Sequence, residues 1–241
     1  MVSLSLKDLV EAVFMERLNR FVIRCRLGNG HVDAHLADPG RLRELLVPGR
    51  HVWLQPAANP GRKTGWSAVL VETENNGLVS LVSALPNALV KAALANKAIP
   101  ELSSWSLIRA EYPVGRHRFD FLLQRGPERM LLEVKSVTLV ENSVGLFPDA
   151  VTLRGRRHLD SLAELTQSGE YQGAVLFVAQ RSDAAYITAA SHIDPRFAAA
   201  FTAARRAGVQ YYGLSCRVSV DRIALEKTLP VLDPDQFAST S

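Results

Sequence analysis

The chain has 241 residues, of which 47% are hydrophobic, and 28 Lys and Arg against 24 Asp and Glu give a net charge of +4. This length permits a sizeable core divided between two domains, and the mild positive charge permits nucleic acid as a partner without requiring it. No apolar run approaches the ~20 residues that span a bilayer, and Cys25 and Cys216 form no CxxC pair. We therefore expect a cytoplasmic protein with no membrane partner and no zinc site.

Residues 1–84 are expected to form a small β-barrel domain of the OB kind. The segment "RFVIRCRL" at 20–27 alternates apolar residues with arginines, as a half-buried strand does. The segment 66–85 is typical of two strands joined at Asn76-Gly77. Between these strands, "DPGRLRELLVPG" at 38–49 predicts a short helix with Asp38 as its N-cap. Short strands around one small helix favour a barrel.

Residues 85–241 are expected to form a larger α/β domain. Helices are predicted at 86–99, which begins at Pro86, at 152–167, which has leucines at 159, 162 and 165 on one side, and at 194–208, which has an Asp-Pro start and a Gly stop. Strands are predicted at 106–114, 118–124, 130–139, 173–180 and 209–219. The order αβββαβ implies an antiparallel beginning and a later right-handed parallel crossover.

Three charges interrupt the apolar strands on either side of the turn at Gly126-Pro127. Asp120 lies in the first strand, and Glu133 and Lys135 lie in the second. A turn centred on Gly126-Pro127 places Asp120 opposite Glu133, and a shift of two residues places it opposite Lys135. In both registers the three side chains share one face of the sheet, so two carboxylates and an ammonium are expected to converge.

Converging carboxylates repel each other unless a cation lies between them, and hard oxygen ligands suit Mg²⁺. Such an ion polarises a phosphoryl oxygen and acidifies a water, while Lys135 stabilises the charge that develops. Asp120 and Glu133, with Glu111 on the preceding strand as a further ligand, therefore indicate metal-dependent phosphodiester hydrolysis. The alternative is that Glu133 and Lys135 form an ordinary solvated ion pair.

The segments "RFDFLL", "LEVKSVTL", "FPDAVTLRGRRHL" and "IDPRFA" resemble the sugar fermentation stimulation protein family of bacteria and archaea. The resemblance implies an N-terminal OB-fold and a C-terminal domain of the PD-(D/E)xK nuclease type, with its motif on Asp120, Glu133 and Lys135. Members are described as DNA-binding proteins linked to maltose and other sugar use, and some as nucleases. The family usually has Asn-Thr-Gly where this chain has Asp-Pro-Gly at 38–40, so the resemblance assigns that loop no role here.

Other residues carry weaker functional signals beside ordinary structural explanations. The resemblance suggests that Gln180 holds substrate or water, although a strand that simply reaches solvent explains it equally well. Nucleic-acid contacts are expected from basic residues on the barrel and on the segments that flank the charged strands, namely Arg20, Arg24, Arg26, Arg118, Arg154, Arg157 and His158. For the helical ones the alternative is a solvated helix face.

The sequence thus predicts a nuclease that acts on DNA or RNA, with Mg²⁺ or Mn²⁺ as cofactor. The alternative hypothesis is a DNA-binding regulator of sugar metabolism that has the nuclease fold but does not catalyse hydrolysis. The intact set of Asp120, Glu133 and Lys135 favours the nuclease, because a protein that only binds DNA has no need of it.

Overall fold

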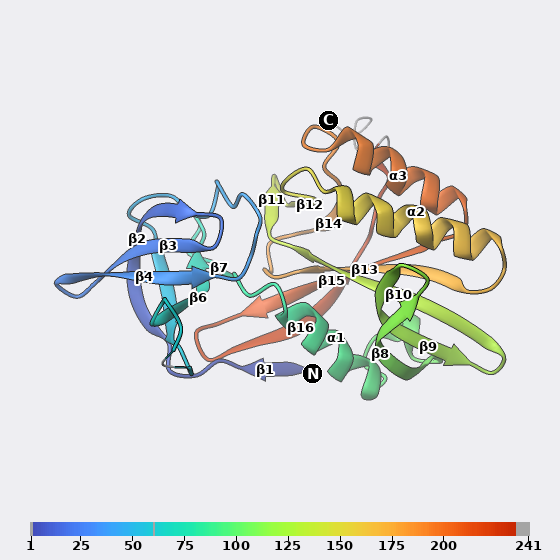
Figure 1. Ribbon diagram of the computed structural model, residues 1–241, viewed down its shortest axis with the longest axis horizontal. Coiled ribbons are helices and arrows are strands. Elements are labelled where there is room, and N and C mark those ends of the chain that lie inside the picture. The colour runs from blue at the N-terminus through green and yellow to red at the C-terminus, as the bar shows by residue number, and fades with distance from the viewer. Residues whose placement is uncertain (1, 60, 235–241) are drawn as a thin grey trace.

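The computed structural model describes residues 2–59 and 61–234, which form a β-barrel beside a larger α/β unit (Figure 1). The barrel strands are β2 (Val10–Asn19), β3 (Val22–Leu27), β4 (Gly30–Leu36), β5 (His51–Pro56), β6 (Trp66–Glu72) and β7 (Leu78–Ser80). They follow the order β4-β3-β2-β5-β6-β7, and a parallel pairing of β4 with β6 closes the ring.

Alternating side chains fill the barrel. In β3, Ile23 and Cys25 are fully buried among the apolar residues of the other strands, whereas Arg24 and Arg26 point outwards. The period of two in the sequence therefore specifies which face of the strand is core. The predicted OB-fold is confirmed.

The helix predicted at 38–49 is wrong, because this segment forms only turns. Leu42 has a positive φ of 49°, which interrupts any helix there. The backbone N–H groups of Arg41 and Leu42 instead donate to the carboxylate of Asp149, which comes from the α/β unit. A tertiary contact thus replaces the N-cap role expected of Asp38, whose Oδ1 accepts only from the nearby Gly40 amide at 2.8 Å.

The sheet of the α/β unit has the strand order β1-β16-β15-β13-β10-β9-β8. Its strands are β1 (Ser3–Ser5), β8 (Ser106–Val114), β9 (His117–Arg125), β10 (Glu128–Val137), β13 (Gln172–Ala179), β15 (Gln210–Val218) and β16 (Arg222–Leu229). Strands β8, β9 and β10 are antiparallel, whereas β10, β13 and β15 run parallel. The predicted αβββαβ order is therefore confirmed.

Helices cover both faces of this sheet (Figure 1). They are α1 (Leu85–Ala95) on one face, followed by the short η1 (Pro100–Leu102), and α2 (Leu153–Gln167) and α3 (Pro195–Arg206) on the other. Local signals start both later helices, since Thr152 accepts from the Gly155 amide and Asp194 accepts from the Phe197 amide. The two faces therefore carry separate apolar cores.

Two features lie outside the predicted plan. A small second sheet is formed by β11 (Leu139–Glu141), β12 (Val144–Phe147) and β14 (Tyr186–Ala189) beside the start of α2. Strand β1 pairs with β16 rather than with the barrel, so the first residues complete the sheet of the other unit. The division into domains 1–84 and 85–241 otherwise stays a prediction. Within the described residues, no helix has the length and apolarity needed to cross a membrane.

Candidate active site

The three charged residues lie where strands β9 and β10 separate. The paired residues sum to 253 from Glu128 with Arg125 to Leu132 with Phe121, which is the register predicted from the turn at Gly126-Pro127. The pairing stops there, one step before Asp120 and Glu133 would face each other. The strand ends therefore open and leave room for polar side chains.

Asp120 occupies this opening and takes the place of the missing ladder bonds. Its Oδ2 accepts from the Val134 amide at 2.7 Å, and its Oδ1 accepts from the Asn87 side chain on α1, also at 2.7 Å. Burial, together with the negative charge of Glu133, raises the pKa of Asp120 to about 6 although both hydrogen bonds act in the opposite direction. A nearby positive charge would therefore stabilise the ionised form of the Asp120 carboxylate.

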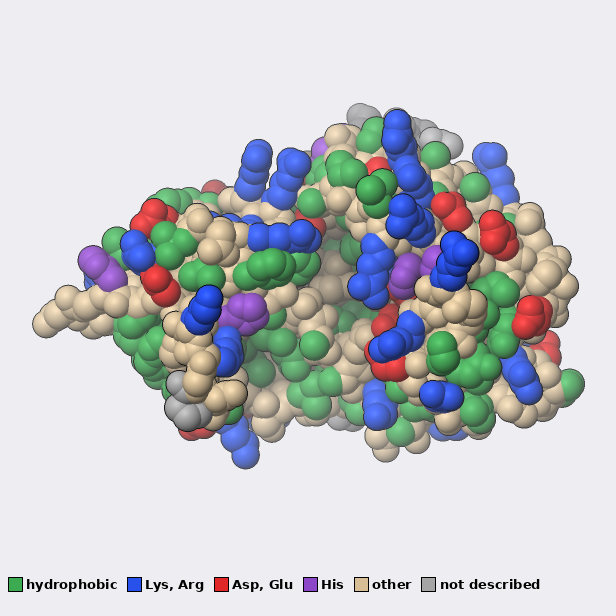
Figure 2. Space-filling model, viewed as in Figure 1, with side chains coloured by type: hydrophobic (Ala, Val, Ile, Leu, Met, Phe, Trp, Pro, Cys, Tyr) green, Lys and Arg blue, Asp and Glu red, His purple; other side chains and the backbone are tan. Residues whose placement is uncertain are grey.

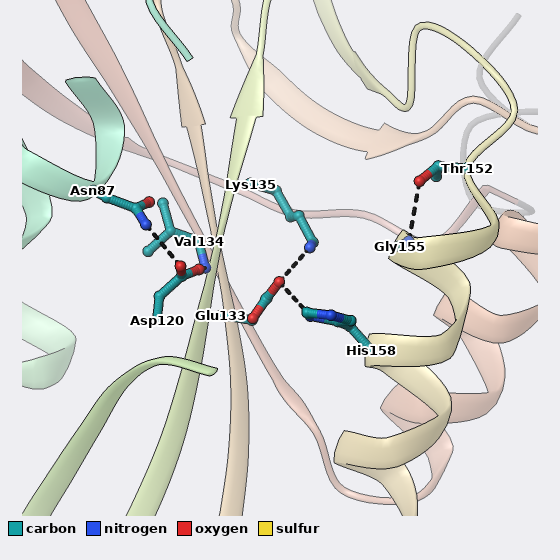
Figure 3. A network of polar contacts seen from close by, with 8 residues as sticks. All are labelled: Asn87, Asp120, Glu133, Val134, Lys135, Thr152, Gly155 and His158. Carbon is teal, nitrogen blue, oxygen red and sulfur yellow. Dashed lines mark hydrogen bonds and ion pairs between the residues drawn. The ribbon is translucent and has the colours of Figure 1, made fainter. Parts of the chain in front are cut away.

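Glu133 is 5% exposed and is held by two nitrogen donors on the other side of β10 (Figure 3). Its Oε1 lies 2.5 Å from Lys135 Nζ and 2.7 Å from Nδ1 of His158 on α2. Burial opposes ionisation, yet the hydrogen bond from His158 and the Lys135 charge outweigh it and hold the pKa of Glu133 below its ordinary value. Glu133 is therefore a buried, charged carboxylate.

The single shared face predicted for the three side chains is wrong for Asp120. Figure 3 shows Asp120 with Asn87 on the α1 side of β10, whereas Glu133, Lys135 and His158 lie on the α2 side. The reason is that the separated strand ends let Asp120 turn towards the Val134 amide and α1. All three predicted residues nevertheless line one cleft of about 410 Å³ between the barrel and the α/β unit.

The chemistry of this cleft suits a hard divalent cation. Glu133 Oε2 is buried and has no hydrogen-bond partner in the part of the chain that the structure describes, although an unpaired buried carboxylate oxygen is costly. Each Asp120 oxygen accepts one hydrogen bond and keeps a further lone pair. Mg²⁺ needs only one or two protein carboxylates when phosphates and waters complete its shell. Asp120 and Glu133 therefore fit such an ion.

Glu111, predicted as a further ligand, is not brought to the cleft. It has a positive φ of 53°, its side chain is exposed, and Oε2 lies 3.6 Å from Arg118 Nη1 in a solvated ion pair. Arg118, predicted to bind nucleic acid, is thus engaged with Glu111 at the surface. Within the described residues, no cluster of three or more His, Cys, Asp or Glu side chains that would hold a metal is found.

Gln180 is fully buried. The alternative explanation, that its strand simply reaches solvent at this residue, is therefore wrong. Its Nε2 donates to Ser136 Oγ at 2.9 Å, and Ser136 lines the cleft two residues from Val134. Gln180 also accepts, through its backbone carbonyl, the amide of Ser80 in the barrel. Its contacts therefore position Ser136 and join the two units.

Apart from Arg118, the predicted nucleic-acid residues divide into three groups. Arg20 and Arg154 line the cleft, and Arg157 is exposed on the same helix as Arg154. Arg24 is engaged by Asp33 at 2.9 Å and by Glu16 at 3.4 Å, whereas Arg26 is exposed on the same strand.

His158 forms the third group, since it is 6% exposed and donates to Glu133 instead of facing solvent. Its expected nucleic-acid contact is replaced by a position behind the carboxylate. The helical period explains why: His158 lies one residue from the buried Leu159, on the face of α2 that packs on the sheet.

Asn87 and Ser136 carried no functional signal in the sequence. Asn87 lies in "LPNAL" on the first helix, and Ser136 directly follows Lys135. Only the packing of α1 against the sheet shows that Asn87 reaches Asp120.

Comparisons with known proteins agree with this architecture. Residues 84–222 match the family described as "Sugar fermentation stimulation protein RE domain", and residues 15–81 match "SfsA N-terminal OB domain". A sugar fermentation stimulation protein homolog of Shouchella clausii is 44% identical over 229 residues, which cover 94% of this chain and 99% of that protein. The homolog of Chloroflexus aggregans is 41% identical over 223 residues, or 92% and 85% of the two chains.

A solved structure, Pyrococcus furiosus SfsA in complex with Ca²⁺, superposes with a TM-score of 0.87 at 26% identity. The superposition covers 96% of this chain and 99% of the other. The arrangement of barrel and α/β unit is therefore shared along nearly the full length of both proteins.

Proposed function

Because the chain belongs to the sugar fermentation stimulation protein family, we propose that it is a nuclease that uses a divalent cation to hydrolyse phosphodiester bonds. The observation that carries this proposal is Glu133, a buried carboxylate that keeps one oxygen unpaired beside Asp120. Burial of such a group is costly, so its retention in a cleft flanked by arginines supports a role in chemistry.

The proposed cofactor is Mg²⁺ or Mn²⁺, held by Asp120 and Glu133. The Pyrococcus furiosus relative was solved with Ca²⁺, which is also a hard divalent cation with oxygen ligands. When bound, such an ion polarises a phosphoryl oxygen and lowers the pKa of a water.

Residues of the chain stabilise charge, orient the two carboxylates and bind the substrate phosphate. Lys135 Nζ, 2.5 Å from Glu133, lies where it stabilises negative charge that builds on the phosphoryl oxygens. His158 fixes the Glu133 side chain from α2, so that Oε2 stays directed away from its two donors. Asn87 and the Val134 amide hold Asp120 in the same way. The substrate phosphate enters between Arg20 and Arg154.

One observation favours a second candidate, a DNA-binding regulator of sugar metabolism without catalysis. Among the described residues no third metal-binding side chain joins Asp120 and Glu133, and Lys135 already neutralises one Glu133 oxygen. In such a protein the same cleft holds a phosphate backbone without cleaving it.

A cleavage assay separates these functions. Purified protein is incubated with labelled DNA and RNA in Mg²⁺, in Mn²⁺ and in chelator, alongside Glu133→Gln. We expect cleavage that requires metal and is lost in the variant. If the protein binds DNA but cleaves no substrate with either metal, the proposal of a nuclease is wrong and that of a non-catalytic regulator takes its place.

A further inference from the structure

Three exposed apolar side chains flank the mouth of the cleft on two sides. Phe21 on the barrel is 46% exposed, and Val151 and Leu153 before and at the start of α2 are 64% and 54% exposed. Val151 lines the cleft, and Phe21 adjoins Arg20, which also lines it. They thus place apolar surface beside a site whose expected ligand is a polyanion.

Hydrogen bonds hold the backbone of Phe21 in place at the edge of the barrel. Its amide donates to Asn19 Oδ1 at 2.9 Å, and its carbonyl accepts from the Leu36 amide at 2.8 Å. The Arg20 guanidinium lies 5.4 Å from the centre of the Phe21 ring, and Arg20 Nε lies 3.3 Å from the Pro39 carbonyl at the edge of the cleft. An aromatic ring and a guanidinium plane together form a platform on which a nucleobase stacks.

Arginines continue from this platform across the barrel. Arg17 Nη2 donates to the Arg20 carbonyl at 2.8 Å and Nη1 to the Arg41 carbonyl at 2.7 Å, so Arg17 fixes both neighbours. A shallow pocket beside them is lined by Arg17, Arg41, Arg43 and Leu46.

None of these barrel arginines forms an ion pair with an acid of the described chain, unlike Arg24. Figure 2 shows Lys and Arg side chains on both sides of the hollow between the two units, with hydrophobic side chains among them. Unpaired arginines suit phosphate oxygens. The cleft therefore offers a basic path with apolar surfaces beside it.

We propose that this cleft takes a single-stranded polynucleotide. The phosphates follow Arg43, Arg41 and Arg20 and cross to Arg154, while a base stacks on the Phe21–Arg20 platform and the next base contacts Val151 and Leu153. In a duplex, stacking covers the base faces that these apolar side chains need and pairing covers the Watson–Crick edges, whereas a single strand can expose both. This inference rests on the proposed function and names its substrate class.

The test measures binding in chelator, so that it does not depend on cleavage. Fluorescence anisotropy compares a labelled DNA strand, its duplex, and a strand of equal length with abasic sites. We expect the wild type to bind the single strand at least about tenfold more tightly than the duplex, and Phe21→Ala to weaken single-strand binding by about tenfold. Phe21→Trp should restore it.

The abasic strand provides the sharpest control. If Phe21 stacks on a base, Phe21→Ala should cost nothing with the abasic strand, whereas Arg41→Ala should weaken binding to both strands and lessen the salt dependence. Val220→Ala removes another exposed apolar residue, which is 48% exposed and does not line the cleft, and should change nothing.

Equal binding of single strand and duplex, or an equal Phe21→Ala effect on normal and abasic strands, would overturn the inference. Neither result bears on cleavage. Conversely, selective single-strand binding without metal-dependent cleavage would support this inference and contradict the proposed nuclease activity.

Discussion

At the scale of single residues, the cleft is built around Glu133. Its Oε1 takes hydrogen bonds from Lys135 and His158, and these donors keep the carboxylate charged despite its burial. Its other oxygen has no hydrogen-bond partner among the described residues. Asp149 Oδ2, which lines the same cleft, is also buried and unpaired, so Glu133 is distinguished by its two cationic or imidazole donors rather than by the unpaired oxygen alone.

Lys135→Ala tests whether the ammonium serves the transition state. Negative charge on the phosphate increases during attack, so loss of Lys135 should slow cleavage by about a hundredfold while nucleic-acid affinity stays within about tenfold. Single-turnover cleavage rates and anisotropy titrations measure the two effects separately. Lys91→Ala, which removes an exposed lysine from α1, is the matched control. If Lys135→Ala cleaves at the wild-type rate, Lys135 has no role in catalysis and is only the ion-pair partner of Glu133.

Asp38 gives a pH-dependent prediction at the junction of the two units. Burial, with a contribution from the charge of Asp149, raises the pKa of Asp38 to about 6, against a partial opposing effect of Arg17 and the Gly40 amide. A folded-state pKa above the unfolded value means that stability present below pH ~4 is lost as the pH rises through ~6.

Asp38→Asn should therefore stabilise the protein at pH 8, by at most about 3 kcal/mol since one pKa unit corresponds to about 1.4 kcal/mol, and should give no gain at pH 4. Urea denaturation at both pH values measures this difference. Asp160→Asn, which changes an exposed aspartate of α2, should shift stability little at either pH. An equal gain from Asp38→Asn at both pH values would contradict the stated cause.

At the scale of elements, sequence patterns predicted what is local. The period of two and the turn at Gly126-Pro127 gave the β9–β10 register correctly, because alternation and turn geometry act over a few residues. Two of the three main helices were predicted from Pro86 and from Asp194-Pro195 at their starts, and the third from its apolar face. The N-cap of that third helix is Thr152, which the sequence pattern did not single out. The position of Asp120 was not predictable, since Asn87 of α1 and the separation of the strand ends decide it.

The helix prediction for segment 38–49 failed for a related reason. Its local signals are those of a helix, but the Asp149 carboxylate, 107 residues beyond Leu42 in the numbering, accepts the amides on which a helix start depends. Charged and polar contacts between distant segments leave no local pattern in the sequence.

Gly40→Ala should disturb this contact between the units. A Cβ on Gly40 would lie 2.0 Å from Asp149 Oδ2, which is closer than any real contact, so the carboxylate must leave the Arg41 and Leu42 amides. We expect the free energy of unfolding to fall by about 1 to 3 kcal/mol, the usual cost of overpacking. Gly65→Ala, where a Cβ meets no atom within 4 Å, is the control. Equal stability of both variants would show that the contact contributes nothing.

At the scale of the whole molecule, function is assigned to the space between the units. Its lining includes Arg20 and Pro39 from the barrel, Asn87 from α1, and Val151 and Arg154 from the region of α2. These positions are far apart in the sequence, which is why Arg41 and Arg43 carried no signal while Arg24, on an obvious strand, did. The fold brings the unpaired arginines together and leaves Arg24 to Asp33.

A calorimetric titration with Mn²⁺ of the wild type, Asp120→Asn, Glu133→Gln and Glu111→Gln tests whether Asp120 and Glu133 hold a metal ion. Asp120 and Glu133 line the cleft, and Glu111 is at the surface with Arg118. The wild type and Glu111→Gln should bind Mn²⁺ alike, because Glu111 is not a ligand in this account. Asp120→Asn and Glu133→Gln should each weaken binding by at least about tenfold, the loss that removal of one charged ligand causes. Unchanged binding in both cleft variants would contradict a metal site at Asp120 and Glu133.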